Sequence, residues 1–211
     1  MSPFSFQSLL VRAFSRIKPC TRAKPILAAA LAFSFGLLPA RSFAAGSSLE
    51  YQVKAGFLFN FAKFVDWPDS TRTTHTTLRL GIVAPDDLYD LMASALSGKV
   101  ANNRPIQVEK VTAAELEKGT SLPDIIFVQQ DASRTRQDWG FTQQQIFAAA
   151  ANQPVLLVGE SAGFATSGGM IGFVQRGENL RFQVNLANAQ RVGLKLSARL
   201  SGLAEIVTTA P

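Results

Sequence analysis

Apolar residues recur at helical spacing soon after residue 45. They lie four, four and three positions apart, as expected for one face of a helix: Val53, Phe57, Phe61 and Phe64. Ser47 and Glu50 match a capping box, which predicts that the helix begins at Ser47. Trp67-Pro68 should end it, because the residue before a proline is disfavoured in the helical region.

Short apolar runs then alternate with helical stripes. The pattern predicts strands at 78–83, 105–111, 124–129 and 154–158. It predicts helices at 86–96, 113–118 and 141–151. Two of the runs, at 124–129 and 154–158, are apolar at consecutive positions, which is typical of central strands covered on both faces. The alternation favours a single α/β domain, a layered sandwich with a mostly parallel sheet flanked by helices.

The last third of the chain has a different pattern. Residues 170–175 and 180–185 are strand-like and are joined by a short turn, which predicts a C-terminal antiparallel hairpin. Apolar residues four and three apart then predict one long helix over 186–207. That helix would carry a basic ridge formed by Arg191, Lys195 and Arg199. Such a ridge is either a solvated face or a docking surface for an acidic partner or anionic headgroups.

The net charge of +6 belongs to the amino-terminal segment. The chain has 21 Lys+Arg and 15 Asp+Glu, and residues 1–44 hold six of the basic residues and no acidic one. The apolar stretch at 26–38 and the small residues of Ser42-Phe43-Ala44 then complete the pattern of a secretory signal peptide. We expect cleavage after Ala44 and a domain over 45–211; an uncleaved membrane anchor is the alternative. The electrically neutral body and its export disfavour a nucleic-acid partner.

Few residues offer catalytic chemistry. Cleavage would remove Cys20, the only cysteine, and the single histidine, His75, lies in a Thr-rich loop without a motif around it. A Ser-His-Asp triad would have to use His75, and no spaced set of metal ligands occurs in the sequence. Asp86, Asp87 and Asp90 lie at a predicted helix start, where capping and dipole roles are commoner than acid–base catalysis. We therefore predict no catalytic site, no metal and no cofactor.

One segment, 159–170, is rich in glycine. It follows a predicted strand, so a phosphate-binding loop has to be considered. The segment matches neither a P-loop nor G-x-G-x-x-G, and it leads into a strand instead of a helix. We interpret it as a loop of tight turns, with a ligand-binding loop as the alternative.

Three segments together resemble the YfiR family: 53–68 its opening helix, 163–171 its glycine-rich segment, and 181–200 its closing strand and helix. The order and spacing agree from residue 49 to about 207. The fingerprint positions, which we interpret mainly as fold determinants, are Phe57, Phe61, Phe64, Trp67, Pro68, Gly163, Phe164, Gly168, Gly169, Asn185 and Ser197.

The resemblance implies a periplasmic α/β sandwich, often a homodimer, that binds the periplasmic domain of an inner-membrane diguanylate cyclase and restrains it. The expected output is cyclic-di-GMP signalling, and hence biofilm formation and motility. The resemblance also implies an outer-membrane lipoprotein of the peptidoglycan-binding type that sequesters the protein and releases the cyclase. The alternative is a periplasmic small-molecule sensing module, in which the glycine-rich loop, Phe164 and Trp67 line a pocket.

Overall fold

The computed structural model describes residues 45–68, 76–111, 121–130 and 136–209. The described residues all belong to one compact unit, Phe43–Pro211. The predicted helix at 113–118 and His75 lie outside the described residues. Within the described part of the chain, no helix combines the length and the apolar character needed to cross a membrane.

The opening helix, α1, spans Ala45–Phe64. It starts before the predicted position, so Ser47 lies inside its first turn and the predicted capping box is wrong. Glu50 instead forms an ion pair with Lys54, one turn further along, at 2.6 Å. The helix ends where predicted, just before Trp67, and continues into the short strand β1, Val65–Asp66.

A sheet of eight strands follows the order β10-β8-β7-β6-β5-β2-β4-β3. The bounds are β2 Leu78–Val83, β3 Val100–Ala101, β4 Arg104–Lys110, β5 Ile125–Val128, β6 Leu156–Gly159, β7 Ile171–Arg176, β8 Asn179–Val184 and β10 Glu205–Ile206. Strands β4, β2, β5, β6 and β7 are parallel to one another. Strand β8 runs antiparallel to β7, which confirms the predicted hairpin and the α/β class.

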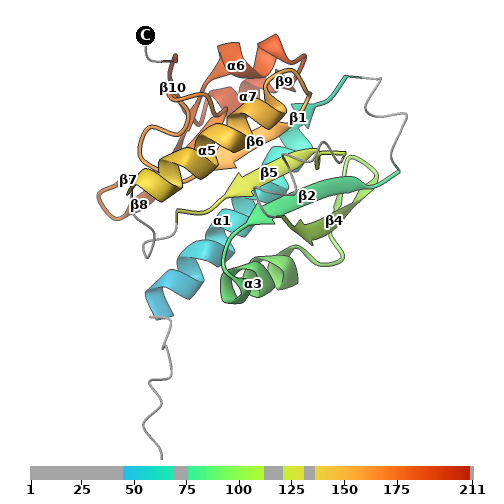
Figure 1. Cartoon of the computed structure of the whole chain (residues 1–211). Coiled ribbons are helices and arrows are strands. Elements are labelled where there is room, and N and C mark those ends of the chain that lie inside the picture. The colour runs from blue at the N-terminus through green and yellow to red at the C-terminus, as the bar shows by residue number, and fades with distance from the viewer. Residues whose placement is uncertain (1–44, 69–75, 112–120, 131–135, 210–211) are drawn as a thin grey trace, which may run out of the picture. The chain divides into compact units, whose positions relative to one another are not determined.

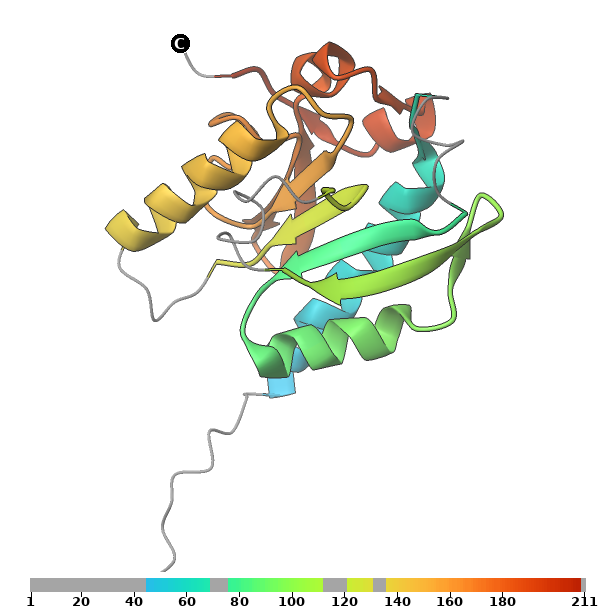
Figure 2. The ribbon, with the colours of Figure 1, turned by 45° about the vertical axis from the view of Figure 1, so that its right-hand side comes forward.

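Helices cover both faces of the sheet (Figure 1). Helices α1 and α3, Asp86–Leu96, lie on one face, and α5, Arg136–Ala150, lies on the other, as a second view also shows (Figure 2). Strand β5 serves both layers: Phe127 packs in the core beneath α1, whereas Val128 packs in the core beneath α5. The consecutive apolar run at 124–129 is therefore a central strand, as predicted.

The predicted long helix over 186–207 is wrong. The segment folds as four short elements: α6 Leu186–Arg191, β9 Lys195–Leu196, α7 Ala198–Ser201 and β10. Gly193 adopts a φ of +82°, in the left-handed region, which ends helical geometry after α6. Strand β9 then pairs with β1, and the Ser197 hydroxyl caps α7 by accepting from the Leu200 amide at 3.2 Å.

Candidate functional site

Helix α1 contributes to two cavities. The first, which we call the polar pocket, has a volume of about 330 Å³ and is lined by Glu50, Tyr51, Lys54, Gln130, Glu160, Phe173, Val174, Gln175 and Leu180. The second, which we call the apolar groove, has a volume of about 380 Å³ and is lined by Phe57, Asn60, Phe61, Lys63, Phe64, Phe182, Arg199, Leu200 and Leu203. The amino-terminal half of α1 borders the pocket, and its carboxyl-terminal half borders the groove.

The polar pocket lies at the carboxyl ends of two parallel strands. Gln130 follows β5, and Glu160 directly follows β6. In open α/β sheets, ligands bind outside the carboxyl ends of strands near the point where the strand order reverses. Here the order reverses between β2 and β5, because the chain places β4 on one side of β2 and β5, β6 and β7 on the other. The pocket is therefore one strand away from the expected ligand position of this architecture.

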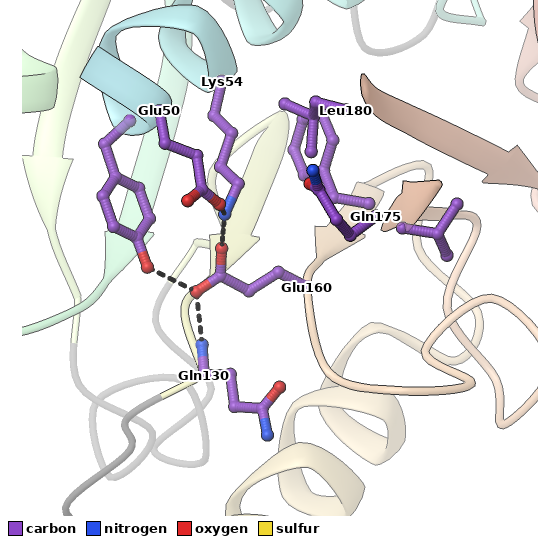
Figure 3. Close-up of a pocket in the computed structure, with 9 residues that line it drawn as sticks. Glu50, Lys54, Gln130, Glu160, Gln175 and Leu180 are labelled. Atoms are coloured by element: carbon purple, nitrogen blue, oxygen red, sulfur yellow. Dashed lines mark hydrogen bonds and ion pairs between the residues drawn. The ribbon is translucent and has the colours of Figure 1, made fainter. Parts of the chain in front are cut away.

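A buried lysine is at the centre of the pocket (Figure 3). The side chain of Lys54 is 5% exposed, and its ammonium group contacts the carboxylates of Glu50 and Glu160. The ammonium also lies 4.4 Å from the ring centroid of Tyr51, within range of a cation–π interaction. A buried charge is tolerated only when it is paired and hydrogen-bonded, and these neighbours provide that compensation.

Glu160 connects the sheet to α1. Its carboxylate accepts from the Tyr51 hydroxyl at 2.9 Å and from the backbone amide of Gln130 at 2.9 Å, besides Lys54. The Tyr51 hydroxyl in turn accepts from the Gln129 side chain at 3.2 Å. Burial, and next the negative charge of Glu160, raises the pKa of the Tyr51 hydroxyl above its ordinary value. Tyr51 is therefore a neutral donor that holds Glu160 in place.

The charges of the pocket favour one class of ligand. Lys54, Glu50 and Glu160 together carry one net negative charge when all three are ionised. Phe173, Val174 and Leu180 form an apolar wall beside them. A small molecule with an amino group and an apolar part would match both features, because the carboxylates attract the amine and the wall covers the remainder.

The apolar groove has an aromatic floor and a basic rim. The ring of Phe182 lies 5.3 Å from that of Phe61 and 5.7 Å from that of Phe57, between centroids. Lys63 and Arg199 are the two charged residues among the nine that line the groove, and both are exposed. The arrangement can bind an apolar surface that carries negative charge at its margin.

The three basic residues predicted to form a ridge lie on three different elements. Arg191 ends α6 and donates to the carbonyl of Ala151 at 2.6 Å. Lys195 is in β9, in register with Asp66 of β1. Arg199 is in α7, where its guanidinium lies 5.6 Å from the ring centroid of Phe64. The predicted ridge on one helix does not form. Of the three residues, Arg199 lines the apolar groove.

The aromatic fingerprint residues contribute to the groove and the core beside it. Phe57, Phe61 and Phe64 line the apolar groove. Trp67 is buried, and its indole nitrogen donates to the carbonyl of Asp124 at 3.3 Å. Pro68 packs beside Gly193, where an added Cβ would lie 3.1 Å from the proline ring.

The glycine-rich segment folds around one aromatic ring. Gly163 and Gly168 have φ values of +73° and +130°, as turns of this kind require. Gly169 leaves room for Phe164, because an added Cβ would lie 2.2 Å from that ring. Phe164 packs beneath α5 and Trp67 packs beneath α1, so the predicted pocket between these two residues does not form.

Two fingerprint residues are helix caps. Asn185 is fully buried and accepts from the Asn188 amide at 3.1 Å, which caps α6. Its side-chain nitrogen donates to the carbonyl of Ala165 at 2.9 Å and thereby ties the glycine-rich loop to β8. Ser197 caps α7, as described above.

The acidic residues at the start of α3 make local contacts. Asp86 forms an ion pair with Lys110, and Asp87 accepts from the Leu88 amide at 2.8 Å. Across the described ranges, no group of three or more His, Cys, Asp or Glu side chains is arranged to hold a metal ion.

Sequence reasoning missed the polar pocket. One signal was present: Lys54 precedes Phe57 by three positions and Phe61 by seven, so it lies within the apolar stripe of α1. A charged residue in a buried stripe requires a partner. Glu160 carries a weaker signal, as the first charged residue after the two-sided strand at 154–158.

A comparison with protein-family models matches residues 51–205 to the DUF4154 family, described as YfiR/HmsC-like. The matched range extends from α1 to the start of β10 and includes every residue that lines the groove and all but Glu50 of the pocket. No curated protein matches the sequence.

Proposed function

This chain belongs to the YfiR/HmsC-like family, and from that premise we propose that it is a regulatory protein of the periplasm and not an enzyme. Its body, residues 45–211, binds the periplasmic part of an inner-membrane diguanylate cyclase and restrains it, which lowers cyclic-di-GMP and limits biofilm formation. Residues 1–44 act as a cleaved signal peptide. An outer-membrane peptidoglycan-binding lipoprotein sequesters the protein and releases the cyclase.

The family match over 51–205 is the observation that carries this proposal. The apolar groove adds physical support, because apolar and aromatic residues at the centre of a polar rim are typical of protein interfaces. The Lys63 and Arg199 side chains at its rim would orient an acidic partner.

Reciprocal capture tests the interaction. The full chain, tagged at its carboxyl terminus, is expressed in its own host, and detergent-solubilised membranes are purified on the tag. We expect an inner-membrane diguanylate cyclase with a periplasmic domain to co-purify, and tagged cyclase to recover this chain in the reverse experiment. The proposal fails if neither direction recovers the other protein while both are present in the membrane extract.

The polar pocket favours a second candidate function, the binding of a small molecule that carries an amino group. Its carboxylates, its apolar wall and its position near the carboxyl ends of parallel strands support this alternative. Thermal-shift screening with amines, amino acids and their carboxylate-only analogues tests it. A ligand present at 100 times its Kd stabilises the folded state by about 2.7 kcal/mol. Val174→Trp, which fills the pocket, should abolish the shift, and a screen without any shift in the native protein would exclude the candidate.

A further inference from the structure

The outward face of α1 exposes two apolar side chains beside the polar residues Glu50 and Gln52. Leu49 and Val53 are 64% and 44% exposed, and Gly56 and Asn60 continue the same face at spacings of three and four. Phe57 and Phe64 adjoin it and line the apolar groove. Within the described residues, nothing in the chain covers this face at Leu49 or Val53.

Gly56 has no role in the packing of the described chain. It lies in the middle of α1, is exposed, and an added Cβ would meet no atom within 4 Å. Glycine weakens a helix relative to alanine, so a glycine in such a position indicates a reason other than the stability of α1. The absence of a side chain allows the backbone of another helix to approach α1 closely at this point.

The charged side chains at the rim of the apolar groove are of one sign, whereas the exposed Glu50 lies near Leu49 at the other end of α1. Lys63 and Arg199 are exposed at the rim of the apolar groove, and no acidic residue lines it. A second copy of this chain placed groove to groove would set these cations against cations, which is unfavourable. An acidic partner would instead pair with both.

We propose that the outward face of α1 and the apolar groove together dock one amphipathic helix of a partner protein, a helix with acidic residues beside its apolar stripe. The partner helix crosses α1 at Gly56, inserts apolar side chains against Phe57 and Phe64, and places carboxylates near Lys63 and Arg199. This is the helix-in-groove mode of recognition. The inference rests on the proposed function, because it assigns the helix to the periplasmic part of the restrained cyclase.

Photo-cross-linking in cells tests the docking surface. A benzoylphenylalanine is introduced at Asn60 of the full chain in its own host, and cross-linked peptides are identified by mass spectrometry. We expect cross-links to a protein segment that is amphipathic at helical spacing and rich in Asp or Glu beside its apolar stripe. Cross-links to a second copy of this chain, to lipid, or to a segment without acidic residues would overturn the proposal.

Two further variants test the contacts. Gly56→Leu should lower the cross-linking yield at least tenfold, because the side chain prevents close approach. Lys63→Glu combined with Arg199→Glu should do the same through like-charge repulsion. Ser94→Leu, at an exposed position of α3, and Gln107→Glu, at an exposed position of β4 near the far edge of the sheet, are the controls and should leave the yield unchanged.

Stability measurements separate loss of docking from loss of folding. Gly56→Ala should raise the melting temperature by about 2–4 °C, since alanine is the better helix former at an open position. Gly56→Leu should melt no lower than the native protein. If Gly56→Leu folds and keeps its cross-linking yield, the surface is not the docking site.

The two proposals fail separately. If the groove variants still capture and restrain the cyclase, the docking surface is wrong and the proposed function stands. If an acidic helix is cross-linked but belongs to a protein other than a diguanylate cyclase, and deletion leaves cyclic-di-GMP unchanged, the surface stands and the proposed function is wrong.

Discussion

The Lys54–Glu160 pair should be a principal stabilising contact between α1 and the sheet. Removing one partner of a buried ion pair costs about 3–5 kcal/mol, because the other charge stays buried without compensation. Glu160→Gln preserves size but sets an amide against the Lys54 ammonium. Glu50 still contacts Lys54 and is itself 46% exposed, so we expect the lower end of that range. A loss of about 3 kcal/mol would lower the urea midpoint by about 1.5 M at an m-value near 2 kcal/mol/M.

A double-mutant cycle isolates the interaction. Lys54→Met leaves Glu160 without a cation, and the double variant Lys54→Met/Glu160→Gln removes both charges. Unfolding in urea, followed by circular dichroism at 222 nm, gives the four free energies. We expect the double variant to be more stable than the sum of the single losses predicts, by about 2 kcal/mol, as coupled neighbours show.

The matched control is the exposed pair between Lys110 and Asp86, whose side chains are 37% and 89% exposed. Its cycle, Lys110→Met with Asp86→Asn, should give a coupling energy below about 0.5 kcal/mol, since solvent screens the pair. The reasoning about the pocket is refuted if the Lys54–Glu160 cycle gives a coupling energy as small as that of this control.

Further substitutions test other parts of the structure. Because the pKa of Tyr51 is raised in the folded state, its contribution to stability is complete below the ordinary value of 10.0 and is lost as the pH rises above it. The free energy of unfolding, measured in urea between pH 9 and pH 11.5, should therefore fall less steeply with pH in Tyr51→Phe than in the native protein. Asn185→Ala should cost about 2–4 kcal/mol, since it removes the α6 cap and the donor to the buried Ala165 carbonyl. Ser197→Ala removes only the α7 cap and should cost about 1 kcal/mol; equal losses in both variants would contradict this assignment. Gly169→Ala should lower the melting temperature markedly, because its Cβ overlaps the ring of Phe164, and a variant that melts as the native protein does would show that the loop adapts.

The α/β framework could be predicted because its signals are local. The run at 124–129 has apolar residues on both faces, and β5 does supply both cores. The hairpin of β7 and β8 was equally clear from its two strand-like runs and short turn. The two-residue strands β1, β3, β9 and β10 were missed, since two residues are too few to show a periodicity.

The closing segment shows how apolar spacing can mislead. Ala189 and Leu200 are both buried, as a continuous helix would require, but they belong to separate short elements, α6 and α7. Gly193 decides the outcome, because its left-handed backbone allows the chain to turn and pair with β1. The pairing partner is more than a hundred residues away in sequence, and no local pattern contains that information.

The polar pocket was missed for a related reason. Lys54 and Glu160 are 106 residues apart, and only the folded sheet brings them together. The apolar groove could be anticipated in part, since Phe57, Phe61 and Phe64 form one helix face, but its rim needed α7 to place Arg199 beside α1. Single residues of a site can be suspected from a sequence, whereas the residues that the fold places beside them depend on long-range topology.

Cellular cyclic-di-GMP tests the central claim most directly. It is quantified by mass spectrometry in strains that lack this chain, the captured cyclase, or both, and in the first strain after the full chain is restored. We predict that loss of this chain raises cyclic-di-GMP, that restoring the chain reverses the rise, and that the rise vanishes when the cyclase is also absent. An unchanged level after loss of this chain, or a rise that persists without the cyclase, would contradict the claim that the protein restrains that enzyme.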